Sequence, residues 1–147
     1  MSYSFLENQQ LILTLAHQFS DAANRKDAAL YRSVWTDDSK WIIGPPINQQ
    51  FDGVDEIVAA FENLLGGWEF FVQLTASYHI KIDGNSATAN FYVNEIARIK
   101  DGDSNYNLAM YQDKLVLKDG KWLFKERNYN VLYLDQSPLK GIAFHQS

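Results

Sequence analysis

Three Asp-Gly pairs in the second half of the chain constrain its fold more than any other feature. They are Asp83-Gly84, Asp101-Gly102 and Asp119-Gly120. Asp-Gly is a strong signal for a tight hairpin turn, because both residue types tolerate the positive φ angles that such turns need. From Trp68 onward, the long segments around these turns alternate apolar and polar residues, as strands with one buried face do. The pattern predicts a four-stranded antiparallel meander.

Helical spacing dominates the first half of the chain. Ser4 and Glu7 match a capping box, in which the side chain of each residue satisfies a backbone donor of the other. The apolar positions that follow share one helix face: Leu11, Leu15, Ala16, Phe19 and Ala23. Asp27 is predicted to be the N-cap of a second helix, which Thr36, Asp37 and Asp38 are expected to end.

Two short strands and a third helix are predicted between the second helix and the meander. Residues 40–43 and 49–51 have the pattern of strands around a Gly-Pro-Pro turn, since proline cannot donate to a strand ladder. The third helix is predicted over residues 55–65 and is expected to end at Gly66 and Gly67 in left-handed geometry. Three helices before one long sheet indicate an α+β fold in a single domain over residues 1–147.

Charge and residue content exclude several functions. A net charge of −5, with 13 Lys and Arg scattered along the chain, argues against nucleic acid binding. Because the chain has no cysteine, it has no thiolate metal site, disulfide or cysteine nucleophile. His17, His79 and His145 are too scattered for a metal site, with His17 expected to be partly buried and His79 to reach the pocket rim. We therefore expect no bound metal. We also expect no cofactor, because the sequence contains no nucleotide-binding fingerprint.

Nothing in the chain indicates export or membrane insertion. The first residues lack a basic leader, and no apolar run is long enough to span a bilayer. We therefore expect a cytoplasmic protein that does not associate with a membrane. Four Trp, eight Tyr and nine Phe are typical instead of a pocket or an oligomer interface.

The order of elements and several segments resemble the SnoaL-like group of the nuclear transport factor two-like superfamily. The segments are Asn24-Arg25-Lys26-Asp27, residues 34–41, Phe51-Asp52-Gly53, and residues 118–122 with Arg127. This group holds polyketide cyclases, scytalone dehydratase, ketosteroid isomerases and dehydrochlorinases. The resemblance covers nearly the whole chain and implies a cone-shaped sheet of about six strands, mixed or antiparallel, on three N-terminal helices. Its pocket takes a small hydrophobic molecule, although such a fold hosts many functions.

Asn24 and Gln73 depart from the pattern that the resemblance implies. In the dehydratase and dehydrochlorinase branches, an Asp at the end of the first helix orients a His on the first long strand, and this His removes a proton from substrate. The matching positions here are Asn24 and Gln73. Amides do not titrate near neutral pH, so this pair can orient a polar ligand but cannot act as a general base. Trp41 matches a wall of the family pocket, with a core role equally open.

Strand alternation selects the side chains expected to face the pocket, because residues two apart share a face. Counted from Gln73, the inward residues are predicted to be Thr75, Ser77, Phe91, Val93, Glu95, Ala97, Asn107, Ala109, Tyr111, Asp113, Arg127, Tyr129 and Val131. Substrate contact is predicted for Asn24, Trp41, Gln73, Phe91, Val93, Arg127 and Tyr129. The chemistry is predicted for Glu95 and Tyr111.

Each charged or aromatic candidate also has a structural interpretation. Desolvation would raise the pKa of Glu95 and allow it to exchange protons near neutrality. An ion pair with Arg127 would instead lower that pKa and make Glu95 structural. Arg127 either binds a ligand oxygen or pairs with Glu95 or Asp113. Tyr111 and Tyr129 either bond a ligand carbonyl or pack the cone.

Three functions therefore remain open from the sequence. The first is a cofactor-independent isomerase, dehydratase or cyclase for a hydrophobic, oxygenated molecule, with Glu95 moving the proton and Tyr111 or Arg127 holding the oxyanion. The second is a module that binds such a ligand without changing it, which the amides Asn24 and Gln73 favour. The third is an assembly subunit, like the small subunits of ring-hydroxylating dioxygenases.

A homodimer through the outer face of the sheet is also predicted. Residues assigned to that face are too apolar for water. They are Tyr78, Ile80, Ile82, Tyr92, Ile96, Leu108, Met110, Val116 and Leu123.

Overall fold

A computed structural model describes residues 2–100 and 102–144, so that Asp101 and His145 lie outside the described residues. The described elements are α1 (Phe5–Arg25), α2 (Ala28–Ser33), β1 (Trp35–Ile43), β2 (Gln49–Asp52), α3 (Val54–Gly66), β3 (Trp68–Asp83), β4 (Ser86–Ile99), β5 (Ser104–Lys118) and β6 (Lys121–Asp135). The predicted α+β class is confirmed.

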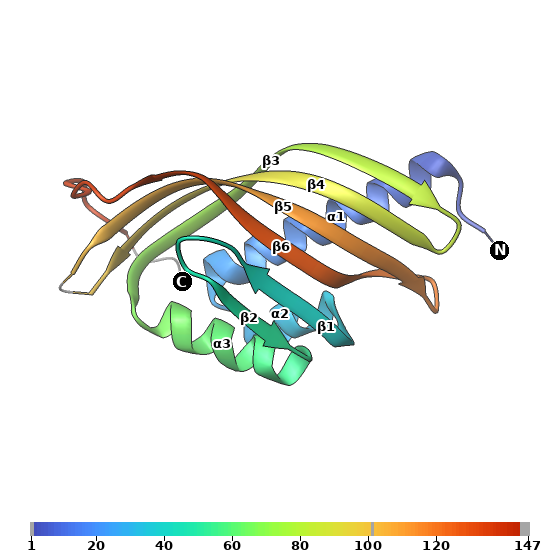
Figure 1. The fold of residues 1–147 in the computed structure, drawn as a ribbon, viewed down its shortest axis with the longest axis horizontal. Coiled ribbons are helices and arrows are strands. Elements are labelled where there is room, and N and C mark those ends of the chain that lie inside the picture. Colours follow the sequence, from blue (N-terminus) through green and yellow to red (C-terminus); the bar gives the residue numbers. More distant parts are fainter. Residues whose placement is uncertain (1, 101, 145–147) are drawn as a thin grey trace.

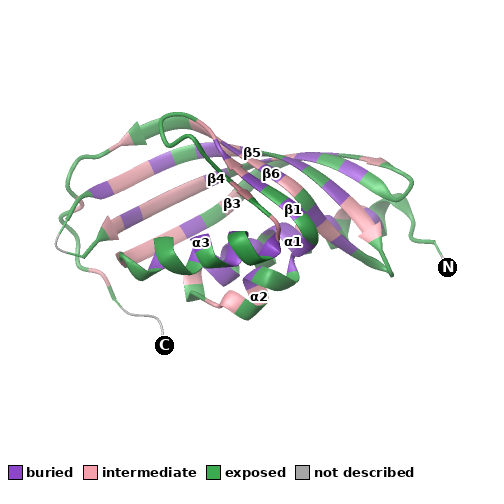
Figure 2. Ribbon diagram, turned by 60° about the horizontal axis from the view of Figure 1, so that its bottom comes forward, coloured by how far each residue is buried: buried purple, intermediate pink, exposed green. Residues whose placement is uncertain are grey.

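The six strands form one mixed sheet in the order β2-β1-β6-β5-β4-β3. β3, β4, β5 and β6 pair antiparallel in succession, which confirms the predicted meander. On its other side, β6 pairs with β1, and these two strands run parallel. β2 and β3 stand at the two ends of this order, so the sheet curls without closing. All three helices lie on the inner side of its arch (Figures 1 and 2).

Both predicted N-caps are confirmed. The Ser4 hydroxyl accepts from the Glu7 backbone N–H, the Glu7 carboxylate accepts from the Ser4 backbone N–H, and Asp27 accepts from the Leu30 backbone N–H. Of the five apolar positions predicted for the buried face of α1, only Leu11 is exposed, at 37%, and Ile12 is buried in addition to the other four. Figure 2 shows the buried residues of the helices turned toward the sheet.

Two predicted helix ends are wrong. α2 ends at Ser33, and residues 36–38 lie in β1, whose first residue Trp35 pairs with Phe124 of β6. Residues 36–38 thus belong to the strand, within an irregular part of its pairing with β6 between Trp35 and Lys40. The second wrong prediction concerns the C-terminal end of α3. Gly67 caps this helix with φ −84° and ψ −10°, which is right-handed and not the predicted left-handed geometry.

A β-bulge in β3 changes which of its side chains face inward. The register shifts between Thr75 and Tyr78, where β3 has one residue more than β4. One extra residue exchanges the two faces for the rest of the strand. Tyr78 therefore lies opposite buried Phe91, and Ile80 is buried.

The bulge corrects several expectations for β3. Tyr78, Ile80 and Ile82 belong to the inner face and not to the outer face predicted for a dimer. Ser77 and His79 are exposed, so neither faces the pocket. His17, expected to be partly buried, is exposed as well.

Aromatic rings fill the space between α1 and the middle of the sheet. Phe19 of α1 is the centre of this cluster, with ring centroids 5.0–6.0 Å from those of four other aromatic residues: Tyr31, Trp35, Tyr111 and Phe124. Offset and edge-to-face contacts of this kind are the preferred geometries of aromatic pairs. This half of the arch is solid core.

Candidate functional site

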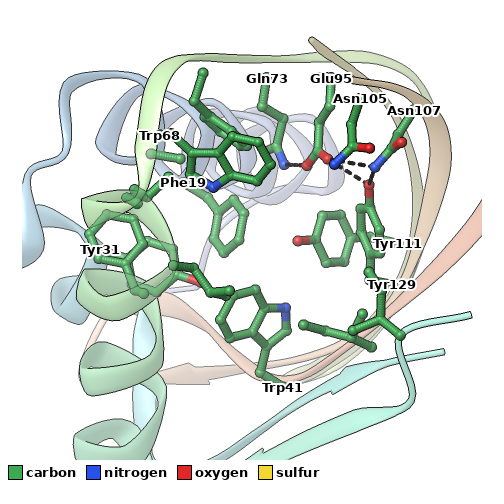
Figure 3. Close-up of a pocket in the computed structure, with 17 residues that line it drawn as sticks. Phe19, Tyr31, Trp41, Trp68, Gln73, Glu95, Asn105, Asn107, Tyr111 and Tyr129 are labelled. Atoms are coloured by element: carbon green, nitrogen blue, oxygen red, sulfur yellow. Dashed lines mark hydrogen bonds between the residues drawn. The ribbon is translucent and has the colours of Figure 1, made fainter. Parts of the chain in front are cut away.

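A cavity of about 150 Å³ lies beside the aromatic core, between the sheet and the helices. It is lined by Phe19, Ala23, Tyr31, Trp41, Ile43, Ile47, Phe61, Leu64, Leu65, Trp68, Phe71, Gln73, Glu95, Asn105, Asn107, Tyr111 and Tyr129. Leu64 and Ile47 are the most exposed apolar lining residues, at 39% and 47%, and mark its mouth. The wall is mainly aromatic and aliphatic, with a few polar groups (Figure 3).

Five of the predicted site residues come together in this wall. Gln73, Glu95, Tyr111 and Tyr129 arrive from four successive strands, and Trp41 comes from β1. Asn107, predicted only to face inward, also lines the cavity. Strand pairing explains the group around Glu95, because Gln73 and Asn107 are its direct neighbours in register on β3 and β5.

The carboxylate of Glu95 is held by neutral donors. Gln73 Nε2 donates to Oε1 at 2.5 Å, and the Tyr129 hydroxyl donates to Oε2 at 2.6 Å. Asn107 Nδ2 lies 3.5 Å from Oε2 and 3.3 Å from the Tyr129 hydroxyl. The dashed lines in Figure 3 follow this cluster along one side of the cavity.

The cluster sets the protonation of Glu95. Burial raises its pKa above the ordinary value, against the hydrogen bonds from Tyr129, Gln73 and Asn107, which lower it. Within the described residues, no Lys, Arg or His forms an ion pair with Glu95. A carboxyl group with a raised pKa and no fixed countercharge is a stronger base than an exposed carboxylate and is suited to take and return a proton.

Arg127 pairs with Asp113 and not with Glu95. Its Nε and Nη2 donate to Asp113 Oδ1 and Oδ2 at 2.7 and 3.0 Å, and both side chains are almost fully buried. Asp113 is the register partner of Arg127, whereas Glu95 pairs with Asn107, six residues back along β5. Six strand residues span roughly 20 Å, which corrects the predicted pairing of Arg127 with Glu95.

Four residues predicted to contact substrate do not line the cavity. Arg127, Phe91 and Val93 are 0–2% exposed and face the core packed against α1. Asn24 is engaged with the backbone of β3: its Nδ2 donates to the Gln73 carbonyl at 2.9 Å, and its Oδ1 accepts from the Gln73 N–H at 2.7 Å. These two hydrogen bonds therefore connect the C-terminal end of α1 to the edge strand β3.

Gln73 links the cavity to α1 through its side-chain oxygen. Gln73 Oε1 accepts from the Ser20 hydroxyl at 2.9 Å, and Ser20 also bonds Thr75 at 2.7 Å. Because Oε1 of Gln73 accepts the hydrogen bond from Ser20, the amide nitrogen Nε2 is oriented toward Glu95. Sequence reasoning treated Gln73 as a ligand contact, and the structure adds this orienting bond.

A second polar group lies across the cavity from Glu95. Within the described residues, the buried indole N–H of Trp41 has no hydrogen-bond partner. Figure 3 shows the Tyr111 hydroxyl directed into the cavity, between Glu95 on one side and the Trp41 nitrogen on the other. Burial raises the pKa of Tyr111 above its ordinary value, against the lowering effects of Arg127 and of the nearby Trp41 side chain, so its hydroxyl stays protonated and able to donate.

Sequence reasoning missed most of the apolar wall. Phe71 and Asn105 lie two residues from Gln73 and Asn107 on the same strand faces, and strand alternation was sufficient to find them. Tyr31 and Phe61 stack with centroids 3.9 Å apart. These two helix residues carried no signal beyond an apolar helix face, since the contact between α2 and α3 is tertiary.

The described residues contain no group of three His, Cys, Asp or Glu placed to hold a metal ion. Nor does the described part of the chain include a helix of the length and apolarity needed to cross a bilayer.

Comparisons with known proteins agree on the fold. A family model described as a SnoaL-like domain matches residues 4–128. A candidate aromatic ring hydroxylase from Novosphingobium aromaticivorans has a similar structure, with a TM-score of 0.85 at 17% identity over 92% of this chain and 96% of that one. A candidate scytalone dehydratase from the same organism has a TM-score of 0.82 at 17% identity, over 92% and 91%.

LinA is a further structural neighbour, with a TM-score of 0.82 at 21% identity over 97% of this chain and 96% of that one. Another structure of LinA type is described as a hexachlorocyclohexane dehydrochlorinase. No curated protein matches the sequence. At such low identities these likenesses establish the fold and leave the chemistry to the residues of the cavity.

Proposed function

The chain belongs to the SnoaL-like domain family, and from this premise we propose that it moves a proton on a hydrophobic, oxygenated small molecule as a cofactor-independent isomerase or dehydratase. Glu95 carries the proton, and the Tyr111 hydroxyl stabilises the oxyanion that forms. The proposal is supported most by one observation: a carboxylate in an aromatic cavity wall, bonded only to neutral donors.

The wall residues have separate roles in the proposed reaction. The Glu95 carboxylate removes a proton from carbon next to a carbonyl, and the electron pair of that C–H bond moves onto the carbonyl oxygen. Tyr111 donates a hydrogen bond to this oxygen as its charge grows, which is worth most in a dry site. Glu95 then returns the proton to another carbon, or to a hydroxyl that leaves from the β-carbon as water.

Hydrogen exchange tests the proton transfer without knowledge of the natural substrate. A panel of neutral ketones is incubated with the protein in D2O, and NMR follows deuterium entering next to the carbonyl. Glu95→Gln is expected to slow exchange by about a hundredfold or more, the usual contribution of a general base. Tyr92→Phe, on the outer face of the sheet, is the control and should exchange at the wild-type rate. Equal exchange by Glu95→Gln and wild type would contradict the proposal.

Ligand binding without conversion is the second candidate function. It is favoured by the side chains of Gln73 and Asn24, which are amides engaged with Glu95, Ser20 and the β3 backbone. A protein of this kind retains saturable binding in the cavity and shows no exchange with any ketone that binds.

We also propose a homodimer through the outer face of the sheet. Leu74, Tyr92 and Leu108 are 57%, 44% and 40% exposed there, and Leu108 lies in register with exposed Tyr133. Contiguous apolar surface of this kind usually marks a contact. A second copy of the chain offers a surface of the same chemistry.

A further inference from the structure

The size of the cavity limits its ligand. Its volume is about 150 Å³, and an apolar cavity of roughly this volume accommodates one benzene molecule. A single six-membered ring fills this space, and a fused second ring must protrude past Leu64 and Ile47 at the mouth.

The charge of the lining also limits the ligand. Among the described residues that line the cavity there is no Lys, Arg or His, and Glu95 is the one acidic residue. Arg127, which was predicted to bind a ligand oxygen, is bonded to Asp113 and is 1% exposed. An anionic ligand would lose its hydration without gaining a countercharge. The lining therefore argues against an anionic ligand.

The unpaired donors indicate where an oxygen of the ligand lies. The Trp41 side chain is nine-tenths buried, its indole N–H has no partner among the described residues, and Figure 3 shows it directed into the cavity. The Tyr111 hydroxyl points into the same space from the neighbouring wall. A buried donor without an acceptor is costly, so an acceptor oxygen between these two groups satisfies both.

We infer that the cavity takes an uncharged compound with one six-membered ring, a cyclic ketone or phenol, whose oxygen accepts hydrogen bonds from Trp41 and Tyr111. The ring lies against the aromatic wall, and the ring carbon next to this oxygen faces Glu95. This inference rests on the proposed function only in taking the cavity as the ligand site, since binding itself requires no turnover.

A protein-detected NMR titration tests size and charge together. Four probes are compared: 2-cyclohexen-1-one, toluene, benzoate and the two-ring ketone 1-tetralone. The expected result is saturable binding of cyclohexenone and toluene, with benzoate and tetralone at least tenfold weaker than cyclohexenone. Tetralone binding as tightly as cyclohexenone would overturn the size limit, and benzoate doing so would overturn the charge limit. Failure of both one-ring neutral probes to saturate would overturn the inference as a whole.

Trp41→Phe tests the position of the oxygen. In wild type, cyclohexenone should move the Trp41 indole N–H resonance downfield, and toluene should not. The variant removes this donor and keeps an aromatic ring, so its affinity for cyclohexenone should fall about three- to tenfold, the effect of one neutral hydrogen bond. Its affinity for toluene should fall less than its affinity for cyclohexenone, because toluene has no oxygen to accept the lost hydrogen bond. An unchanged affinity for cyclohexenone would place the oxygen elsewhere.

Glu95→Gln separates this inference from the proposed proton transfer. The variant should still bind cyclohexenone saturably while losing hydrogen exchange. If the one-ring probes fail to bind but larger ketones exchange through Glu95, only the ligand class is wrong. If the one-ring ketone binds and exchange does not depend on Glu95, only the proton transfer is wrong.

Discussion

The guanidinium carbon of Arg127 lies 3.7 Å from the centroid of the Tyr111 ring, close enough for a cation–π contact. Tyr111 lines the cavity, whereas Arg127 is held in the core by Asp113 and also lies 4.0 Å from the Phe124 centroid. The Arg127 guanidinium thus contacts Tyr111, a residue of the cavity wall, from within the core. Because Arg127 is committed there, Glu95 keeps a neutral environment.

Removing this cation should cost stability. Arg127→Met leaves the Asp113 carboxylate buried and unpaired, and breaking a buried pair in this way typically costs about 3–5 kcal/mol. Asp113→Leu/Arg127→Met removes both charges and should recover most of that loss. Urea unfolding of the three proteins measures the difference. A double variant no more stable than Arg127→Met would show that the loss comes from packing and not from the unpaired charge.

Glu95 should make stability depend on pH in a defined direction. Its folded-state pKa is raised above the ordinary 4.5 because burial disfavours the carboxylate. At pH below 4.5 the group is protonated in both states and its contribution to stability is fully present; as pH rises through the folded-state pKa, that contribution is lost. Wild type should therefore lose stability relative to Glu95→Gln between pH 4 and pH 7, as followed by urea unfolding. A relative gain over this interval would mean that the pKa is lowered.

Asn24→Asp should destabilise the edge strand at neutral pH. Asn24 both donates to and accepts from the Gln73 backbone, and a carboxylate can accept but cannot donate. We expect a loss of about 1–3 kcal/mol at pH 7, the cost of a buried carbonyl left facing an acceptor. Part of the loss should return as pH falls and the new carboxyl group is protonated, which thermal unfolding at pH 7 and pH 5 can follow. Equal stability of Asn24→Asp and wild type at pH 7 would contradict this role of Asn24.

The proposed dimer predicts a change in mass. Light scattering should give twice the chain mass for wild type and the chain mass for Leu108→Lys, because the new charge lies in the apolar outer face. Leu6→Lys replaces a residue of α1 that is 73% exposed and should leave the mass unchanged. A wild-type monomer in dilute solution would refute the dimer.

Local patterns predicted much of the fold because their causes are local. The capping box of Ser4 and Glu7 is closed within one turn of helix, and the turn after Asp83 lies between two strands whose alternation is visible in the chain. Strand alternation also placed Gln73, Glu95, Tyr111 and Tyr129 on the face that lines the cavity. The same rule failed beyond Thr75, since a single extra residue reverses the two faces and alternation carries no signal for it.

By itself, then, the sequence determined the meander, the helix N-caps and the inner face of the strands as far as the bulge beyond Thr75, because each depends on neighbours within a few residues. Only the tertiary structure decided that Asp113 forms the ion pair with Arg127 and that Asn24 bonds the backbone of β3. It also decided that the cavity lies beside Glu95, whereas Phe91 and Val93 are buried in the core. These outcomes depend on strand register and on where α1 crosses the arch, and both arise from contacts between residues distant in the chain.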